Sequence, residues 1–148
     1  MAEIFPTEGL DLIIGVIPKN GTTPASTYMG LFTTFTASTV GTAGNPRASY
    51  TEPSGGAYAR QTIAAASWGS NADGGGSADQ PGRKTTAGQV TFPTATAVWG
   101  TVNGFFIANS SATSAGSLWF ACNFDDTTAV VINTNDIIKV TPTWEIRN

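Results

Sequence analysis

The feature that most constrains the fold of this chain is a regular succession of short apolar segments and turns. After Pro18, roughly eight segments rich in β-branched and aromatic residues alternate with clusters of Gly, Asn, Asp and Ser, at a spacing of about 8–12 residues. No segment beyond Pro18 sustains the 3.6-residue period of an amphipathic helix. Such spacing is typical of β-sandwiches and barrels. We therefore predict an all-β fold, a single-domain β-sandwich or jelly-roll-like barrel with long loops.

The N-terminal region departs from this pattern. In the apolar stretch 10–17, "LDLIIGVI", the Leu and Ile residues have helical spacing, but Gly15 and the β-branched residues fit a strand equally well. Pro18 ends this stretch, because proline cannot continue the backbone hydrogen bonding of either element.

This contrast divides the chain into two parts. We predict a short N-terminal arm or helix at residues 1–18 and a β-sandwich domain at residues 19–148. Within the arm, Ile4 and Phe5 are the candidate residues for contact with a partner. They are apolar side chains in a terminal segment that a domain core does not require.

Two segments with strong apolar character define the expected core. The segment Thr27–Phe35, "TYMGLFTTF", alternates two sets of side chains and is predicted to be a largely buried strand. The segment Thr91–Ser111, "TFPTATAVWGTVNGFFIANSS", carries no charge, and Pro93 and Gly104 among others interrupt it too often for a membrane span. Because strands buried on both faces are almost continuously apolar, we predict that it forms a central core strand.

The closing segment "DIIKVTPTWEI" has two distinct faces. Period-two alternation places an apolar set on one face: Ile138, Val140, Pro142 and Trp144. It places a mostly polar set on the other face: Ile137, Lys139, Thr141 and Thr143. Pro142 predicts an edge or bulge position, because proline donates no hydrogen bond to a neighbouring strand.

The composition limits the possible partners. Charged residues make up 11% of the chain and the net charge is −3, against about 25% charged residues in an average soluble domain. A surface so poor in charge favours association, and an acidic chain does not suit nucleic-acid binding. Arg83 and Lys84 form the one adjacent basic pair and are retained as further candidate interface residues. We predict neither a nucleic-acid partner nor a membrane partner.

The residues needed for most catalytic sites are missing. The chain has no histidine, so a Ser-His-Asp or Cys-His arrangement cannot form and the usual zinc ligand is absent. Its single cysteine, Cys122, is predicted to be a buried, inert thiol. Asp125 and Asp126 are adjacent in "NFDDTT", which is typical of a turn rather than of a carboxylate pair for glycoside hydrolysis. We predict no catalytic residues, no cofactor and no metal.

The tryptophans allow two interpretations. Each lies in an apolar, strand-like segment, which favours core packing, while an exposed row of indoles would instead stack on sugars. The four residues are Trp68, Trp99, Trp119 and Trp144.

Several segments in order along the chain resemble a family of small virion proteins of tailed bacteriophages. They are "LDLIIG", "YMGLFTT", "GGAYARQTI", "VTFPTATAVWGTVNGFFIAN", "GSLWFACNF" and "NTNDIIKVTPTWEI". Proteins of this kind are head decoration (cement) proteins or tail-fibre-like proteins. The resemblance implies a non-enzymatic structural protein with a β-sandwich or jelly-roll-like body.

The resemblance leads to three functional hypotheses. The first is a capsid decoration protein, made in the bacterial cytoplasm, that binds the outer head surface through the major capsid protein and associates as a homotrimer. The alternative is a tail or fibre component that recognises glycans on the host surface. A carboxylate-dependent hydrolase is the third hypothesis and the one that the sequence favours least.

Overall fold

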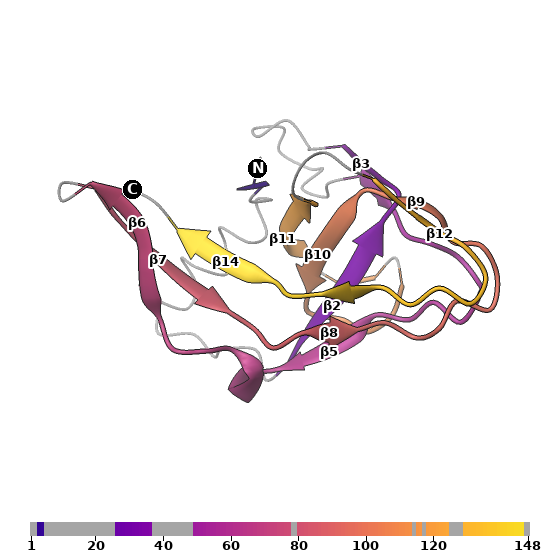
Figure 1. Ribbon diagram of the computed structural model, residues 1–148, viewed down its shortest axis with the longest axis horizontal. Helices are drawn as coiled ribbons and strands as arrows, with labels where there is room; N and C mark the ends of the chain where they lie inside the picture. Colours follow the sequence, from indigo (N-terminus) through magenta and orange to yellow (C-terminus); the bar gives the residue numbers. More distant parts are fainter. Residues whose placement is uncertain are drawn as a thin grey trace.

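The computed structural model describes residues 3–4, 26–36, 49–77, 80–113, 115–116, 118–124 and 129–146 (Figure 1). These residues form antiparallel strands and one 3₁₀ turn, η1 (Ala65–Ser67), and contain no α-helix. The all-β prediction is therefore confirmed. The strands are β1 (Glu3–Ile4), β2 (Ser26–Phe32), β3 (Thr34–Thr36), β4 (Ser49–Thr51), β5 (Gln61–Ala64), β6 (Ala72–Ser77), β7 (Gln80–Thr86), β8 (Val90–Thr91), β9 (Gly100–Val102), β10 (Gly104–Ala108), β11 (Leu118–Asn123), β12 (Val130–Ile132), β13 (Lys139–Val140) and β14 (Thr143–Ile146).

A five-stranded sheet, in the order β1-β11-β10-β2-β5, forms the centre of the molecule. Every residue of β10 is buried, and β2 is buried from Met29 to Phe32. Alternate residues of β2 point to opposite faces: Met29 and Leu31 pack in the larger core cluster, and Phe32 packs in the smaller one. The predicted buried strand Thr27–Phe35 is confirmed as far as Phe32, whereas Thr34 and Phe35 belong to β3 in a separate sheet.

The segment Thr91–Ser111 is not one central strand. It contains the end of β8, all of β9 and all of β10, and only β10 belongs to the five-stranded sheet. Gly100, with φ of +84°, lies at the start of β9, and the chain passes from the second layer into the central sheet at Asn103. The prediction was correct for Gly104–Ala108 and wrong for the residues before it.

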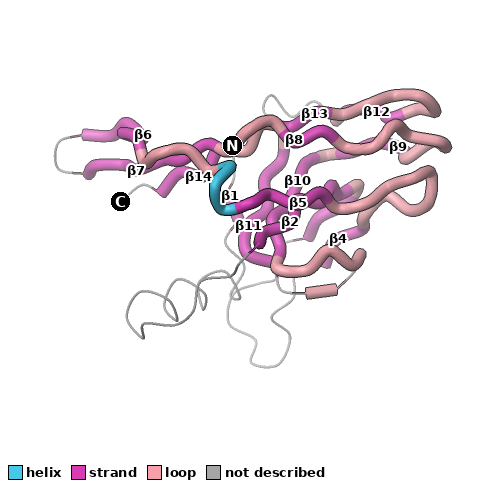
Figure 2. Tube along the Cα trace, turned by 90° about the horizontal axis from the view of Figure 1, so that it is seen from below, coloured by secondary structure: helices cyan, strands magenta, loops and turns pink. Residues whose placement is uncertain are grey.

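The second layer consists of two strand pairs, β8 with β13 and β9 with β12. Figure 2 shows these pairs running along one side of the five-stranded sheet. Their buried residues, among them Val90, Val102 and Ile132, share one core cluster with Leu31 and Phe105 of the central sheet. This arrangement of two packed β layers places the main hydrophobic core between them.

The opposite face of the central sheet is covered by the hairpin of β3 and β4. Phe35 and Tyr50 of this hairpin pack on Phe32 and Phe106. The ring of Phe106 lies across Gly30, where an added Cβ would come within 2.1 Å of the Phe106 Cζ atom. A glycine is therefore required in β2 so that the phenyl ring can lie flat on the sheet.

A β-bulge in β11 allows this strand to bury side chains on both faces. Ile107 pairs with Phe120, while Ala108 pairs with Leu118, so Trp119 is the extra residue. The shift places Phe120 in the main core and Leu118 on the opposite face. Five consecutive residues of β11 are buried, as in β10, because both faces of the central sheet are covered.

A three-stranded sheet, β14-β7-β6, projects from this body (Figure 1). Trp144 of β14 stacks on Phe120 of the main core, with ring centroids 6.1 Å apart. The two faces predicted for the closing segment are confirmed, because Ile138, Val140 and Pro142 are buried and Ile137 is 53% exposed. Pro142 lies between β13 and β14, where it interrupts the ladder.

Candidate functional site

The described residues that the sequence singled out for partner contact lie in two different sheets. Ile4 is in β1, where it pairs with Ala121 of β11 in the same chain. Phe5 and the remainder of residues 5–25 lie outside the described residues. Whether Ile4 and Phe5 contact a partner stays a prediction.

Arg83 and Lys84 are neighbours on β7 and point to opposite faces of the projecting sheet. Arg83 lies opposite Asp73 of β6, and Lys84 lies opposite Glu145 of β14. Oppositely charged residues at facing positions stabilise a strand pair by about 0.2–1 kcal/mol. The basic pair is therefore divided between two faces, each with an acidic residue in register.

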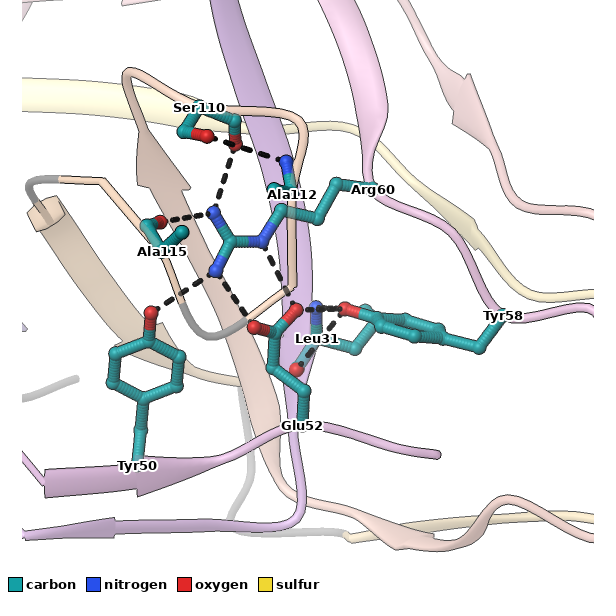
Figure 3. A network of polar contacts seen from close by, with 8 residues as sticks. All are labelled: Leu31, Tyr50, Glu52, Tyr58, Arg60, Ser110, Ala112 and Ala115. Carbon is teal, nitrogen blue, oxygen red and sulfur yellow. Dashed lines mark hydrogen bonds and ion pairs between the residues drawn. The ribbon is translucent and has the colours of Figure 1, made fainter. Parts of the chain in front are cut away.

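The main cluster of buried polar groups surrounds an ion pair between Glu52 and Arg60 (Figure 3). Glu52 directly follows β4 and Arg60 directly precedes β5, so the intervening turn brings them together. This turn contains Gly55, Gly56 and Ala57, all with positive φ. The Nη2 of Arg60 lies 2.6 Å from the Oε1 of Glu52, and the two side chains are 0% and 3% exposed.

All five N–H groups of the Arg60 guanidinium donate hydrogen bonds. Nε and Nη2 donate to the carboxylate of Glu52, and Nη2 also donates to the hydroxyl of Tyr50. Nη1 donates to the backbone oxygens of Ser110 and Ala115, 2.8 and 2.9 Å away, in the loop between β10 and β11. Arg60 thus connects the turn between β4 and β5 with the loop between β10 and β11.

Electrostatics favour the charged form of Arg60. Burial alone would lower the pKa of Arg60, but hydrogen bonding to Glu52 and attraction by its charge outweigh burial, and the pKa is raised. The hydroxyl of Tyr58 donates to Glu52 and accepts the N–H of Leu31. Burial, followed by the negative charge of Glu52, raises the pKa of Tyr58.

This network has the properties of a structural brace rather than of a catalytic site. Both carboxylate oxygens of Glu52 accept hydrogen bonds, and the guanidinium has no remaining donor. A general base needs access to a proton on a substrate, and these side chains are enclosed. Asp125 and Asp126, which are predicted to lie in a turn, are outside the described residues.

The tryptophans form no exposed row within the described residues. Trp99 and Trp119 are each 5% exposed, and Trp99 donates from Nε1 to the backbone oxygen of Gly56. Trp68 and Trp144 are half-buried against the core. The interpretation as core residues is confirmed for Trp99 and Trp119.

A cavity of about 360 Å³ lies at the end of the central sheet, where β2 and β11 end and β10 begins. We call it the end cavity. It is lined by two phenylalanines, two threonines and two asparagines, none of them charged: Phe32, Phe35, Thr33, Thr34, Asn103 and Asn123. Its volume falls within the range of about 300–1,000 Å³ typical of small-molecule sites.

Backbone hydrogen bonds hold the wall of the end cavity. Asn103 donates from its backbone to Phe32 and from its side chain to Thr33, and its own carbonyl accepts the N–H of Phe124. Its side-chain orientation is therefore fixed. The half-buried ring of Phe35, tilted by 43° to that of Phe32, forms the apolar wall.

Three polar groups at the end cavity are available to a ligand. Among the described residues, the Asn123 amide, the Thr34 hydroxyl and the Oδ1 of Asn103 make no hydrogen bond with the protein. Asn123 and Thr34 are exposed and Asn103 is half-buried. Amide and hydroxyl groups beside an aromatic wall can bind the hydroxyls and the C–H face of a sugar ring.

The sequence did not reveal the end cavity, because its three parts are separated by about 70 and 20 residues and unite only at the end of the sheet. The one local signal is Asn103, a polar residue between Val102 and Gly104 in an otherwise apolar stretch. In the described part of the chain, no group of three or more potential ligands could hold a metal ion. No described helix is long and apolar enough to cross a membrane.

One family model, described as "Podophage GP4 fiber I protein gp80", matches residues 11–143 of this 148-residue chain. No curated protein matches the chain. The matched region includes the brace around Arg60 and every residue of the end cavity.

Proposed function

This chain belongs to the podophage GP4 fiber I protein gp80 family, and on that premise we propose that it binds glycans of the host surface through the end cavity. Family membership makes the chain a non-enzymatic structural component of the phage fibre. The resemblance to virion proteins of tailed phages is thereby confirmed. The glycan-binding role is the proposal, and it extends the fibre hypothesis drawn from the sequence.

The family corrects the main functional hypothesis drawn from the sequence. A capsid decoration protein was favoured, with a fibre component as the alternative, and the matched family is a fibre family. The segments that carried the resemblance are apolar strand patterns, which many virion β-proteins share. Such patterns identify the body and do not distinguish where in the virion it resides.

The proposal rests on one observation. In a cavity without charged residues, polar groups that make no hydrogen bond with the protein lie beside an aromatic wall. The amide of Asn123 and the hydroxyl of Thr34 face solvent, while Asn103 is held by three hydrogen bonds. Because the orientation of Asn103 is fixed in advance, this side chain loses less conformational entropy on binding. The lack of charge favours neutral, hydroxyl-rich ligands over phosphate or carboxylate ligands.

A glycan array probed with the full chain tests the proposal. We expect binding to bacterial surface oligosaccharides and a loss of at least about tenfold in affinity for Asn123→Ala, which corresponds to about 1.4 kcal/mol. The matched control is Asn133→Ala. Asn133 is an exposed asparagine that follows β12 and does not line the end cavity. Absence of binding to every array glycan, or equal losses for both variants, would overturn the proposal.

The predicted protein partners stay predictions. They are the major capsid protein, which accompanied the decoration hypothesis, and further copies of the chain in a homotrimer. Sedimentation equilibrium of the full chain measures the homotrimer directly, because a trimer has three times the mass of the 15.3 kDa chain.

A further inference from the structure

A second cavity, of about 290 Å³, adjoins the end of the central sheet on its other side. It lies where β10 and β11 meet β13 and β14, so we call it the seam cavity. Its lining contains two phenylalanines and a polar rim: Phe105, Phe124, Cys122, Asn123, Lys139, Val140, Thr141 and Thr143. The proposed function does not involve this cavity.

The two cavities meet at Asn123. This residue ends β11 and lines both of them. The next residue, Phe124, walls the seam cavity, while its backbone N–H donates to Asn103 of the end cavity, 3.0 Å away. One short piece of chain therefore separates the cavities, and a single exposed amide serves both.

The cavities share one chemical feature and differ in charge, since Lys139 lines only the seam cavity. Each sets an aromatic ring that is only partly buried, Phe35 in one and Phe124 in the other, beside exposed polar side chains. In the seam cavity these polar groups are Thr141 and Lys139. Two adjacent sites of similar chemistry suit a ligand made of similar repeating units.

We propose that the end cavity and the seam cavity form one extended site for an oligosaccharide, with consecutive sugar units on either side of Asn123. This inference rests on the proposed glycan-binding function and specifies the ligand class. A monosaccharide fills one cavity only. An oligomer of two or more units fills both, and the second unit binds without a second loss of translational freedom.

Chain-length dependence of affinity tests the inference. The probes are ladders of one to six units of glucose, galactose, mannose and N-acetylglucosamine, printed as an array and followed by titration calorimetry with each ladder that binds. We expect the disaccharide or trisaccharide to bind at least about tenfold more tightly than the monosaccharide, and no comparable gain once both cavities are filled.

Substitution in the seam cavity separates the inference from the proposed function. Thr141→Trp fills the cavity, and we expect it to reduce trisaccharide affinity to that of the monosaccharide. Lys139→Ala removes one rim group with little risk to folding, because Lys139 is exposed, and is expected to act in the same direction more weakly. Thr101→Trp, at an exposed position of β9, is the matched control.

The possible results have distinct meanings. Equal affinity for all chain lengths, or a Thr141→Trp variant that keeps full trisaccharide affinity while Asn123→Ala loses it, refutes the extended site and leaves the proposed function standing. Failure of every ladder and every array glycan to bind refutes both.

Discussion

Removal of Arg60 is predicted to destabilise the fold strongly. Its side chain is completely buried with that of Glu52, and its guanidinium makes five hydrogen bonds to the carboxylate, one hydroxyl and two backbone oxygens. In Arg60→Ala the carboxylate of Glu52 is left buried without its partner, a loss that costs about 3–5 kcal/mol. For a domain of this size the cost corresponds to a melting temperature lower by roughly 6–20 °C.

Urea denaturation followed by circular dichroism and tryptophan fluorescence measures this loss. The double variant Glu52→Leu with Arg60→Met removes both charges, and we expect it to be less destabilised than the sum of the single substitutions, with a coupling energy of about 0.5–3 kcal/mol. Gln89→Ala, a substitution at an exposed position between β7 and β8, is expected to change stability by less than about 0.5 kcal/mol. A cost below about 1 kcal/mol for Arg60→Ala would refute the interpretation of the network as a brace.

Two further predictions concern pH and packing. Because burial and then the charge of Glu52 raise the pKa of Tyr58 above its usual value of 10.0, the unfolded chain loses this proton at lower pH than the folded chain. The free energy of unfolding should therefore fall by about 1.4 kcal/mol per pH unit above pH 10 relative to Tyr58→Phe, and identical pH profiles would contradict this. Gly104→Ala places a Cβ 2.1 Å from the backbone oxygen of Cys122 and should cost about 1–3 kcal/mol or more. The control Gly88→Ala, which meets open space, should be neutral in the same urea titration.

The strand patterns predicted well which residues are buried. Alternation identified the faces of Met29–Phe32 and of Ile137–Pro142 correctly, because successive side chains of a strand point to opposite sides. It did not identify where strands end. The segment Thr91–Ser111 is continuous in apolar character but changes layers at Asn103, and only the tertiary fold determines that change.

The polar groups were harder to predict from the sequence. Arg60 contacts residues that are 8 to 55 positions away in the sequence. The composition shows only that charged residues are rare in this chain. The sequence placed Arg83 and Lys84 together as a basic pair, whereas the register of the projecting sheet sets each opposite an acidic residue. Contacts of this kind depend on strand pairing, which sequence spacing does not specify.

The projection of β14, β7 and β6 from the body has a consequence for how the chain opens. The ring of Trp144 on Phe120 joins β14 to the main core, and β7 and β6 follow β14 in the sheet, so the ladder between β6 and β7 can separate without exposing that core. Amide hydrogens of β6 and β7 should therefore exchange with solvent through local opening, near the low end of the range between zero and the global free energy. Those of Phe106, in a strand paired on both sides, should exchange only when the body unfolds. The projecting sheet therefore opens at a lower free energy than the body unfolds, and a single melting temperature describes only the body.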